Sequence, residues 1–140
     1  MTAVPAIQGI VETALHVKSV ARATEFYERL LGIEKILGDD RFAALPLPGA
    51  QVLLLFLEGG TGDPMTFAGG VIPPHGGSGD LHVAFKIAAD ALAAWERRLS
   101  ELGITIESTV KWERGGTSLY FRDLDHHLIE LITPGCWAVY

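Results

Sequence analysis

The sequence predicts an α+β fold built from two tandem βαβββ modules, and three observations support this prediction. Eight of the 16 glycines and three of the seven prolines lie in residues 59–80, a composition typical of a linker. The linker divides the 140 residues into two parts of similar length. Each part contains Leu-His-Val, an amphipathic stretch, Leu-Gly-Ile and then three short β-like runs. We expect one domain over residues 1–140, with module 1 at about 7–58, the linker at 59–79 and module 2 at about 80–134.

In module 1, a short apolar strand at residues 15–17 precedes a helix. Apolar residues keep helical spacing from Val20 to Leu31 and give this helix one apolar face. Ser19 is the expected N-cap, because its hydroxyl can accept from an early backbone N–H. Gly32 is expected to end the helix in the left-handed conformation. Three strands are expected next, at residues 33–37, 41–47 and 51–58.

Module 2 repeats this order. Its first strand contains residues 81–83, and its helix begins after Asp90 as the expected N-cap and ends before Gly103. Its strands are expected at residues 104–112, 117–122 and 127–132. A single four-stranded sheet with one helix leaves much of one sheet face uncovered, so we expect the two halves to pair.

Composition and charge exclude several classes of function. Eleven basic against 17 acidic residues give a net charge of −6, without the positive footprint of a nucleic-acid-binding protein. The longest apolar run, residues 52–57, is far below the ~20 residues that span a bilayer. Cys136 is the only cysteine, which excludes an internal disulfide and fits a reducing compartment. No positive charge precedes Lys18, so we expect no secretory signal and a cytoplasmic location.

Two histidines occupy equivalent positions in the repeat. Because alternate side chains of a strand share a face, His16 lies beside Ala14, and His82 lies beside Ala84. If the halves pair with approximate two-fold symmetry, both imidazoles face one cavity and invite a metal ion. The alternative for each histidine taken singly is a hydrogen-bonded core residue. His75, in the linker, is expected to be a solvated loop histidine, with a role in a lid as the alternative.

Glu130 is a carboxylate between apolar residues of the last strand, where burial is costly unless the group is paired or binds a cation. Aligning the fourth strands of the two halves places Leu54 opposite Glu130, so no fourth protein ligand is expected. His16, His82 and Glu130 therefore predict an open site for one divalent ion, namely Fe²⁺, Mn²⁺, Ni²⁺ or Zn²⁺.

The paired modules and the terminal YFRDLDHHLIEL resemble the vicinal oxygen chelate superfamily. That superfamily includes glyoxalase I, extradiol dioxygenases, fosfomycin-resistance thiol transferases and bleomycin-resistance binding proteins. The resemblance implies a glyoxalase-like open barrel whose first and last strands hold the metal, here through His16, His82 and Glu130. It also implies a small oxygenated substrate and a homodimer, whose cavities in some members combine modules of different subunits.

Two further residues follow from the resemblance. Tyr120, ten residues before Glu130 in Leu-Tyr-Phe-Arg-Asp, is similar to the substrate-contacting tyrosine of the extradiol dioxygenase signature and is the expected catalytic residue. His126 stands where that signature has a turn glycine. Ser118 shares the strand face of Tyr120 and resembles part of the oxyanion-binding strand of fosfomycin enzymes, so it is the expected substrate-binding residue. Dioxygenase-like chemistry is the leading prediction. The alternatives are a metal-free ligand-binding protein of the bleomycin-resistance type and a fosfomycin-type thiol transferase.

Overall fold

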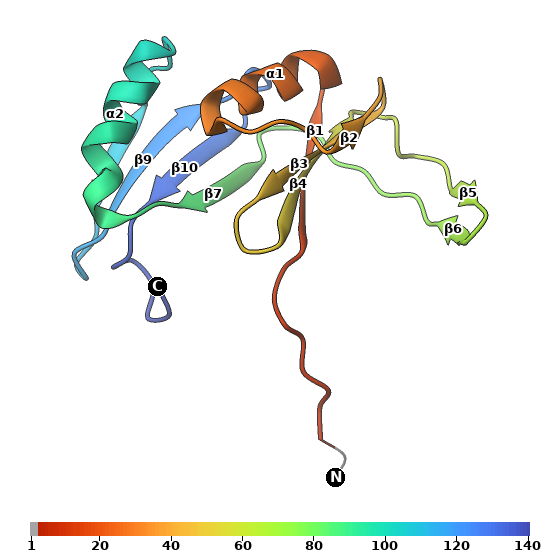
Figure 1. Cartoon of the computed structure of the whole chain (residues 1–140), viewed down its shortest axis with the longest axis horizontal. Helices are drawn as coiled ribbons and strands as arrows, with labels where there is room; N and C mark the ends of the chain where they lie inside the picture. The colour runs from red at the N-terminus through yellow and green to blue at the C-terminus, as the bar shows by residue number, and fades with distance from the viewer. Residues whose placement is uncertain (1–2) are drawn as a thin grey trace.

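The structure, a computed structural model, describes residues 3–140 and contains two four-stranded sheets with the same strand order (Figure 1). The first sheet has the order β1-β4-β3-β2, with β1 parallel to β4. Its elements are β1 (Glu12–Val17), α1 (Val20–Leu31), β2 (Leu37–Gly38), β3 (Phe42–Leu47) and β4 (Gln51–Leu57).

The second sheet has the order β7-β10-β9-β8, with β7 parallel to β10. Its elements are β7 (His82–Lys86), a 3₁₀ turn η1 (Ala89–Ala91), α2 (Leu92–Glu101), β8 (Ser108–Lys111), β9 (Thr117–Arg122) and β10 (Leu128–Ile132). The α+β class and the βαβββ order of both halves are confirmed. The two sheets stay separate, so one chain does not by itself close a barrel.

The helix ends agree with the sequence at three positions and differ at one. Ser19 accepts a hydrogen bond from the backbone N–H of Arg22 and caps α1, and Gly32 ends it with φ of 67°. Gly103, with φ of 71°, follows the C-cap of α2. Asp90 is not the N-cap of α2: it lies inside η1, and the capping position is Ala91, whose side chain cannot accept a hydrogen bond.

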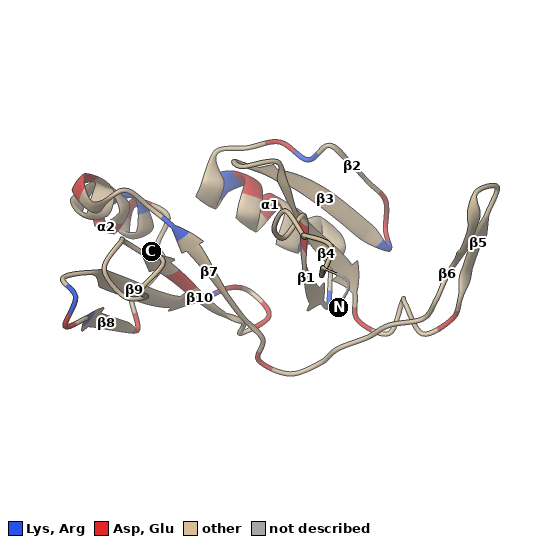
Figure 2. Cartoon of the chain, turned by 90° about the horizontal axis from the view of Figure 1, so that it is seen from below, with Lys and Arg blue, Asp and Glu red and all other residues tan. Residues whose placement is uncertain are grey.

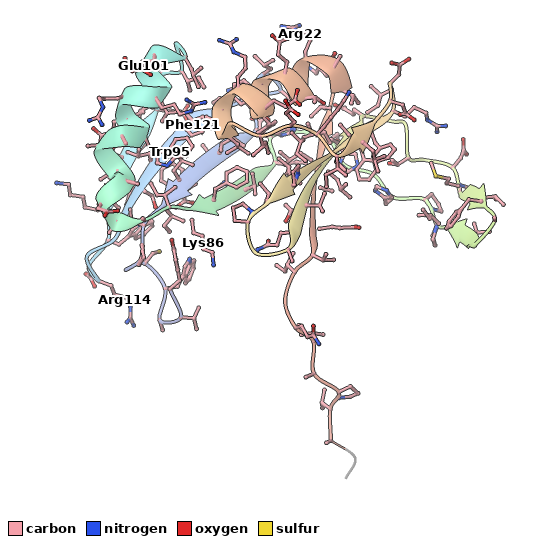
Figure 3. All side chains as sticks on the ribbon, viewed as in Figure 1. Arg22, Lys86, Trp95, Glu101, Arg114 and Phe121 are labelled. Atoms are coloured by element: carbon pink, nitrogen blue, oxygen red, sulfur yellow. The ribbon has the colours of Figure 1, made fainter. Side chains whose placement is uncertain are left out.

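Both helices lie on the same side of the molecule, above the two sheets (Figure 1). Odd-numbered residues of the central strands, such as Leu15, Leu55, Phe121 and Ile129, face the helices and form one continuous apolar core. In Figure 3, Phe121 points toward the helices, whereas Lys86 lies on the opposite side of the second sheet. Even-numbered residues of the same strands therefore lie on the other face of each sheet, which neither helix covers and which we call the open face.

The turn between β9 and β10 joins module 2 to module 1. The Tyr27 hydroxyl donates a 2.5 Å hydrogen bond to the buried Asp123 carboxylate. Nδ1 of the buried His127 accepts from the backbone N–H of Leu81, so its other ring nitrogen, Nε2, donates to the carbonyl of His16 at 2.7 Å. The modules are thus fixed to each other next to a predicted metal ligand.

The linker is more ordered than its composition predicts, because it folds into a hairpin of β5 (Met65–Phe67) and β6 (Gly70–Ile72). Two hydrogen bonds close its base: the His75 N–H donates to the Thr61 carbonyl, and the Thr61 hydroxyl donates to the His75 carbonyl. The hairpin carries no charged side chain and projects from the body of the protein (Figure 2). Across residues 3–140, no helix has the length and apolarity required to cross a membrane.

Candidate metal centre

His82 and Glu130 meet on the open face of the second sheet. Nε2 of His82 lies 3.2 Å from Oε1 of Glu130. The His82 side chain is 48% exposed, whereas that of Glu130 is 7% exposed. Nδ1–H of His82 donates to the Leu128 carbonyl at 2.8 Å, which leaves Nε2, the ring nitrogen that faces Glu130, as the one available to an ion. For an ion about 2.1 Å from both atoms, the Nε2–metal–Oε1 angle would be about 100°, which is a normal coordination angle.

Glu130 is oriented by a short chain of hydrogen bonds behind it. The Ser118 hydroxyl donates to Oε2 of Glu130 at 2.5 Å, and Nε1–H of Trp112 donates to the Ser118 oxygen at 2.8 Å. Ser118 is fully buried, so its placement favours a positioning role over the substrate contact expected from the sequence. Such partners fix the direction of a metal-binding carboxylate and leave its other oxygen, here Oε1, free for the ion.

Tyr120 lies directly across the strand pair from Glu130 on the same face. Its ring stacks on His82 with centroids 6.4 Å apart. Burial first, and then the Glu130 carboxylate, raise the pKa of the Tyr120 hydroxyl above its ordinary value of 10. At neutral pH this hydroxyl is therefore a proton-bearing donor beside the His82–Glu130 pair.

His16 is on the open face of the first sheet and is buried. Neither of its ring nitrogens has a hydrogen-bond partner among the described residues. Burial first, and then nearby His75, lower the pKa of His16, so the ring is kept neutral. A buried imidazole with two unpartnered nitrogens is costly unless a ligand or water completes its hydrogen bonding.

The first sheet also supplies a carboxylate that the sequence alignment misses. In the parallel strand pairs, His16 is opposite Phe56 and His82 is opposite Leu128, so Glu58 is the positional counterpart of Glu130. The backbone N–H of Glu58 donates a hydrogen bond to the Val17 carbonyl, which continues the parallel β1–β4 pairing one residue beyond β4. Assigning this position to Leu54 was wrong, because counting along the strand ignored the strand pairing. Glu58 lines a small cavity of about 220 Å³ together with His16.

One chain does not bring the three predicted ligands together. Among residues 3–140, no group of three His, Cys, Asp or Glu side chains is placed to hold a metal ion. His16 lies on one open face, and the His82–Glu130 pair lies on the other. Each face nevertheless offers part of a ligand set for a divalent ion: His82 and Glu130 at coordinating separation on one, and the unpartnered imidazole of His16 on the other.

His75 is exposed, as expected of a linker side chain, but its ring also lies against the same face as His16. Its ring packs edge-on against Phe56, with centroids 4.8 Å apart, and against His16, with centroids 5.7 Å apart. The backbone after it is also close, since a Cβ at Gly77 would lie 2.9 Å from Nδ1 of His16. No sequence pattern indicates this contact, because it depends on how the linker folds back over the first sheet.

Comparison with known proteins identifies the family. The profile described as Glyoxalase/Bleomycin resistance protein/Dioxygenase superfamily matches residues 9–131. The chain belongs to this superfamily. The fosfomycin resistance protein FosX of Listeria innocua serovar 6a is 31% identical over 133 residues, which cover 89% of each chain. The metallothiol transferase FosB of Bacillus licheniformis is 40% identical over 53 residues, covering 37% of this chain and 34% of that protein.

A solved structure resembles the whole fold. The crystal structure of a lactoylglutathione lyase from Agrobacterium tumefaciens superposes with a TM-score of 0.84 at 28% identity, covering 94% of this chain and 98% of that one. The resemblance to the superfamily expected from the sequence is therefore confirmed. The curated relatives favour the fosfomycin-type alternative over the dioxygenase-like prediction.

Proposed function

We propose that this superfamily member is a divalent-metal-dependent enzyme whose site forms between two copies of the chain. His16 of one copy would join His82 and Glu130 of the other, and the two-fold relation would create two identical sites. The observation behind this proposal is that each chain presents half of a ligand set on each of two open faces. A divalent ion bound there would supply Lewis acidity toward two neighbouring oxygens of a small substrate.

Exposed apolar segments support a second copy as the partner. Several large apolar side chains of the N-terminal segment and of the β5–β6 hairpin are exposed: Val4, Ile7, Ile10, Met65, Phe67 and Val71. Both segments project from the body of one chain (Figures 1 and 2). Such surface is commonly covered in an interface.

Among substrate classes, we favour a small phosphonate or carboxylate that carries an epoxide, as fosfomycin does. The support is the 31% identity to a fosfomycin resistance protein over 89% of both chains. Addition of a thiol to an epoxide breaks one C–O bond and the S–H bond, and forms one C–S bond and one O–H bond. No oxidant is consumed. The protonated Tyr120 beside His82 would donate a hydrogen bond to an oxygen of the substrate.

The direct test incubates the metal-loaded protein with fosfomycin in three arms: glutathione, cysteine, and no added thiol. Mass spectrometry of the products separates thiol addition from hydration. We expect metal-dependent loss of the epoxide in at least one arm, and loss of that activity in Glu130→Gln. Complete recovery of fosfomycin from every arm would exclude this substrate.

Glu58 favours a second candidate, a glyoxalase-type isomerisation. With Glu58 beside His16, the two-copy site would hold two histidines and two carboxylates in a symmetric arrangement. Moving a proton between adjacent carbons of a hemithioacetal requires a base, and a carboxylate can serve. The same preparation is therefore incubated with methylglyoxal and glutathione, and thioester formation is followed by absorbance. Glu58→Gln should abolish this activity if it is present.

A mixing experiment tests the shared site separately from the substrate. His16→Ala and Glu130→Ala chains should each bind little metal alone. If they are denatured together and refolded, mixed dimers regain one intact site, since each chain supplies what the other lacks. The expected result is recovery of about one quarter of the wild-type metal, because half of the dimers are mixed and each holds one of two sites. No recovery in folded, dimeric material would contradict a site shared between copies.

A further inference from the structure

The β5–β6 hairpin returns to the body of the protein at His75, which neither the family resemblance nor the sequence assigns to the metal site. The backbone N–H and carbonyl of His75 are both bonded to Thr61, with distances of 3.0 and 2.5 Å. Its ring is held edge-on against Phe56. The backbone of residue 75 is therefore anchored by two hydrogen bonds, and the ring, although exposed, packs on Phe56.

The His75 ring has no hydrogen bond or ion pair of its own within residues 3–140, and it lies beside His16, whose ring nitrogens are also unpartnered. The two ring centroids are 5.7 Å apart, with an angle of 65° between the planes. A metal–nitrogen bond of about 2.1 Å places a ring centre about 3.2 Å from the ion. The centroids of two imidazoles bound to one ion are then about 5.2–5.7 Å apart when the N–metal–N angle is about 110–125°.

We propose that His75 is an additional metal ligand, so that each site contains three imidazoles: His16 and His75 of one copy and His82 of the other. This inference rests on the proposed function, because it concerns the same ion. It assigns the hairpin a structural purpose, which is to hold a second imidazole over the first sheet next to His16.

Histidine side-chain NMR tests the assignment without relying on activity. In protein labelled with ¹⁵N at histidine, Zn²⁺ should shift the ring nitrogens of His16, His75 and His82 and leave those of His126 and His127 in place. His16→Gln, His75→Gln, His82→Gln and His126→Asn each remove one set of ring signals, and the set left unassigned belongs to His127. His126 is a suitable control because its exposed ring pairs with Asp80.

Co²⁺ titration gives a second readout. His75→Gln should weaken Co²⁺ binding by at least about 10-fold and change the visible spectrum of the bound ion, whereas His126→Asn should change neither. Circular dichroism and sedimentation show whether each variant is folded and has the wild-type association state.

The outcomes separate the two proposals. Zn²⁺-dependent shifts at His16 and His82 without one at His75, together with an unchanged Co²⁺ affinity in His75→Gln, would overturn this inference alone. An absence of Zn²⁺-dependent shifts at His16 and His82 would overturn the proposed metal site itself.

Discussion

The Tyr27 hydroxyl and the Asp123 carboxylate form a buried 2.5 Å hydrogen bond that joins the helix of module 1 to the last turn of module 2. The other oxygen of Asp123 accepts from the backbone N–H groups of Asp125 and His127. Asp123 thus organises the turn and attaches it to α1. Because His127 of this turn bonds to the His16 carbonyl, the same contact influences the position of a candidate metal ligand.

Tyr27→Phe should lower the free energy of unfolding by about 1.5–3 kcal/mol, because it removes a hydrogen bond to a buried charged group. Urea denaturation measures the change. Tyr140→Phe is the matched control: that half-buried hydroxyl donates only to backbone carbonyls, at 3.1 and 3.3 Å, so we expect about 1 kcal/mol or less. Equal effects of the two substitutions would contradict a special role for the Asp123 contact.

Deprotonation of Tyr27 should also lower the free energy of unfolding at alkaline pH. Burial first, and then Asp123, raise the pKa of Tyr27 well above its ordinary value of 10. The folded protein therefore retains a proton that the unfolded chain releases near pH 10. This contribution is fully present below pH 10 and is lost as the pH rises from 10 toward the folded-state pKa. Urea midpoints from pH 8 to 11 should fall more steeply for wild type than for Tyr27→Phe, and parallel curves would disprove the linkage.

Ser118→Ala should weaken metal binding although Ser118 is not proposed to touch the ion. The substitution leaves Oε2 of Glu130 and Nε1–H of Trp112 without their partner. We expect a loss of about 10–100-fold in Co²⁺ affinity, the range typical of removing a group that orients a ligand. Ser108→Ala, on the neighbouring strand and exposed, serves as control and should bind normally. An unchanged affinity in Ser118→Ala would show that Glu130 does not need this orientation.

Gly77→Ala should disturb the His16 side of the site. The new Cβ would lie 2.9 Å from Nδ1 of His16, so the buried ring or the linker must move. Gly76→Ala provides the control one residue away, because its Cβ would meet no atom within 4 Å. Isothermal titration with Zn²⁺ should show weaker binding for Gly77→Ala than for Gly76→Ala. Identical binding would mean that the linker does not lie against His16 in solution.

The sequence was sufficient to predict the repeat and several of its local signals. Ser19 and Gly32 act at the ends of α1 as predicted, because capping depends on neighbouring residues only. The strand expected at residues 33–37 is observed only as Leu37–Gly38, which shares one residue with it, and the strand expected at 104–112 shortens to Ser108–Lys111. Both lie at an edge of their sheet and have one neighbouring strand, so they are strands only over the residues that pair with that neighbour.

The candidate site was predictable where strand alternation determines it and not where long-range contacts do. Alternation places His82 and Glu130 on one face, and the structure brings them together. Glu58 was missed because its equivalence to Glu130 follows from strand pairing rather than from residue order. The contact between His75 and His16 was not predicted, because it arises when a hairpin folds back over the sheet. Both omissions concern the first sheet, where the linker meets the predicted metal-binding face.

The two hydrogen bonds between Thr61 and His75 also have an evolutionary consequence. They close the hairpin at its base, so the segment between them is anchored at both ends regardless of its length. Lengthening a closed loop costs little conformational entropy, and surface loops tolerate insertions. Related chains can therefore diversify residues 62–74 while the imidazole at position 75 stays in place. The hairpin is the part of this protein in which new specificity can arise without rebuilding the strands beneath it.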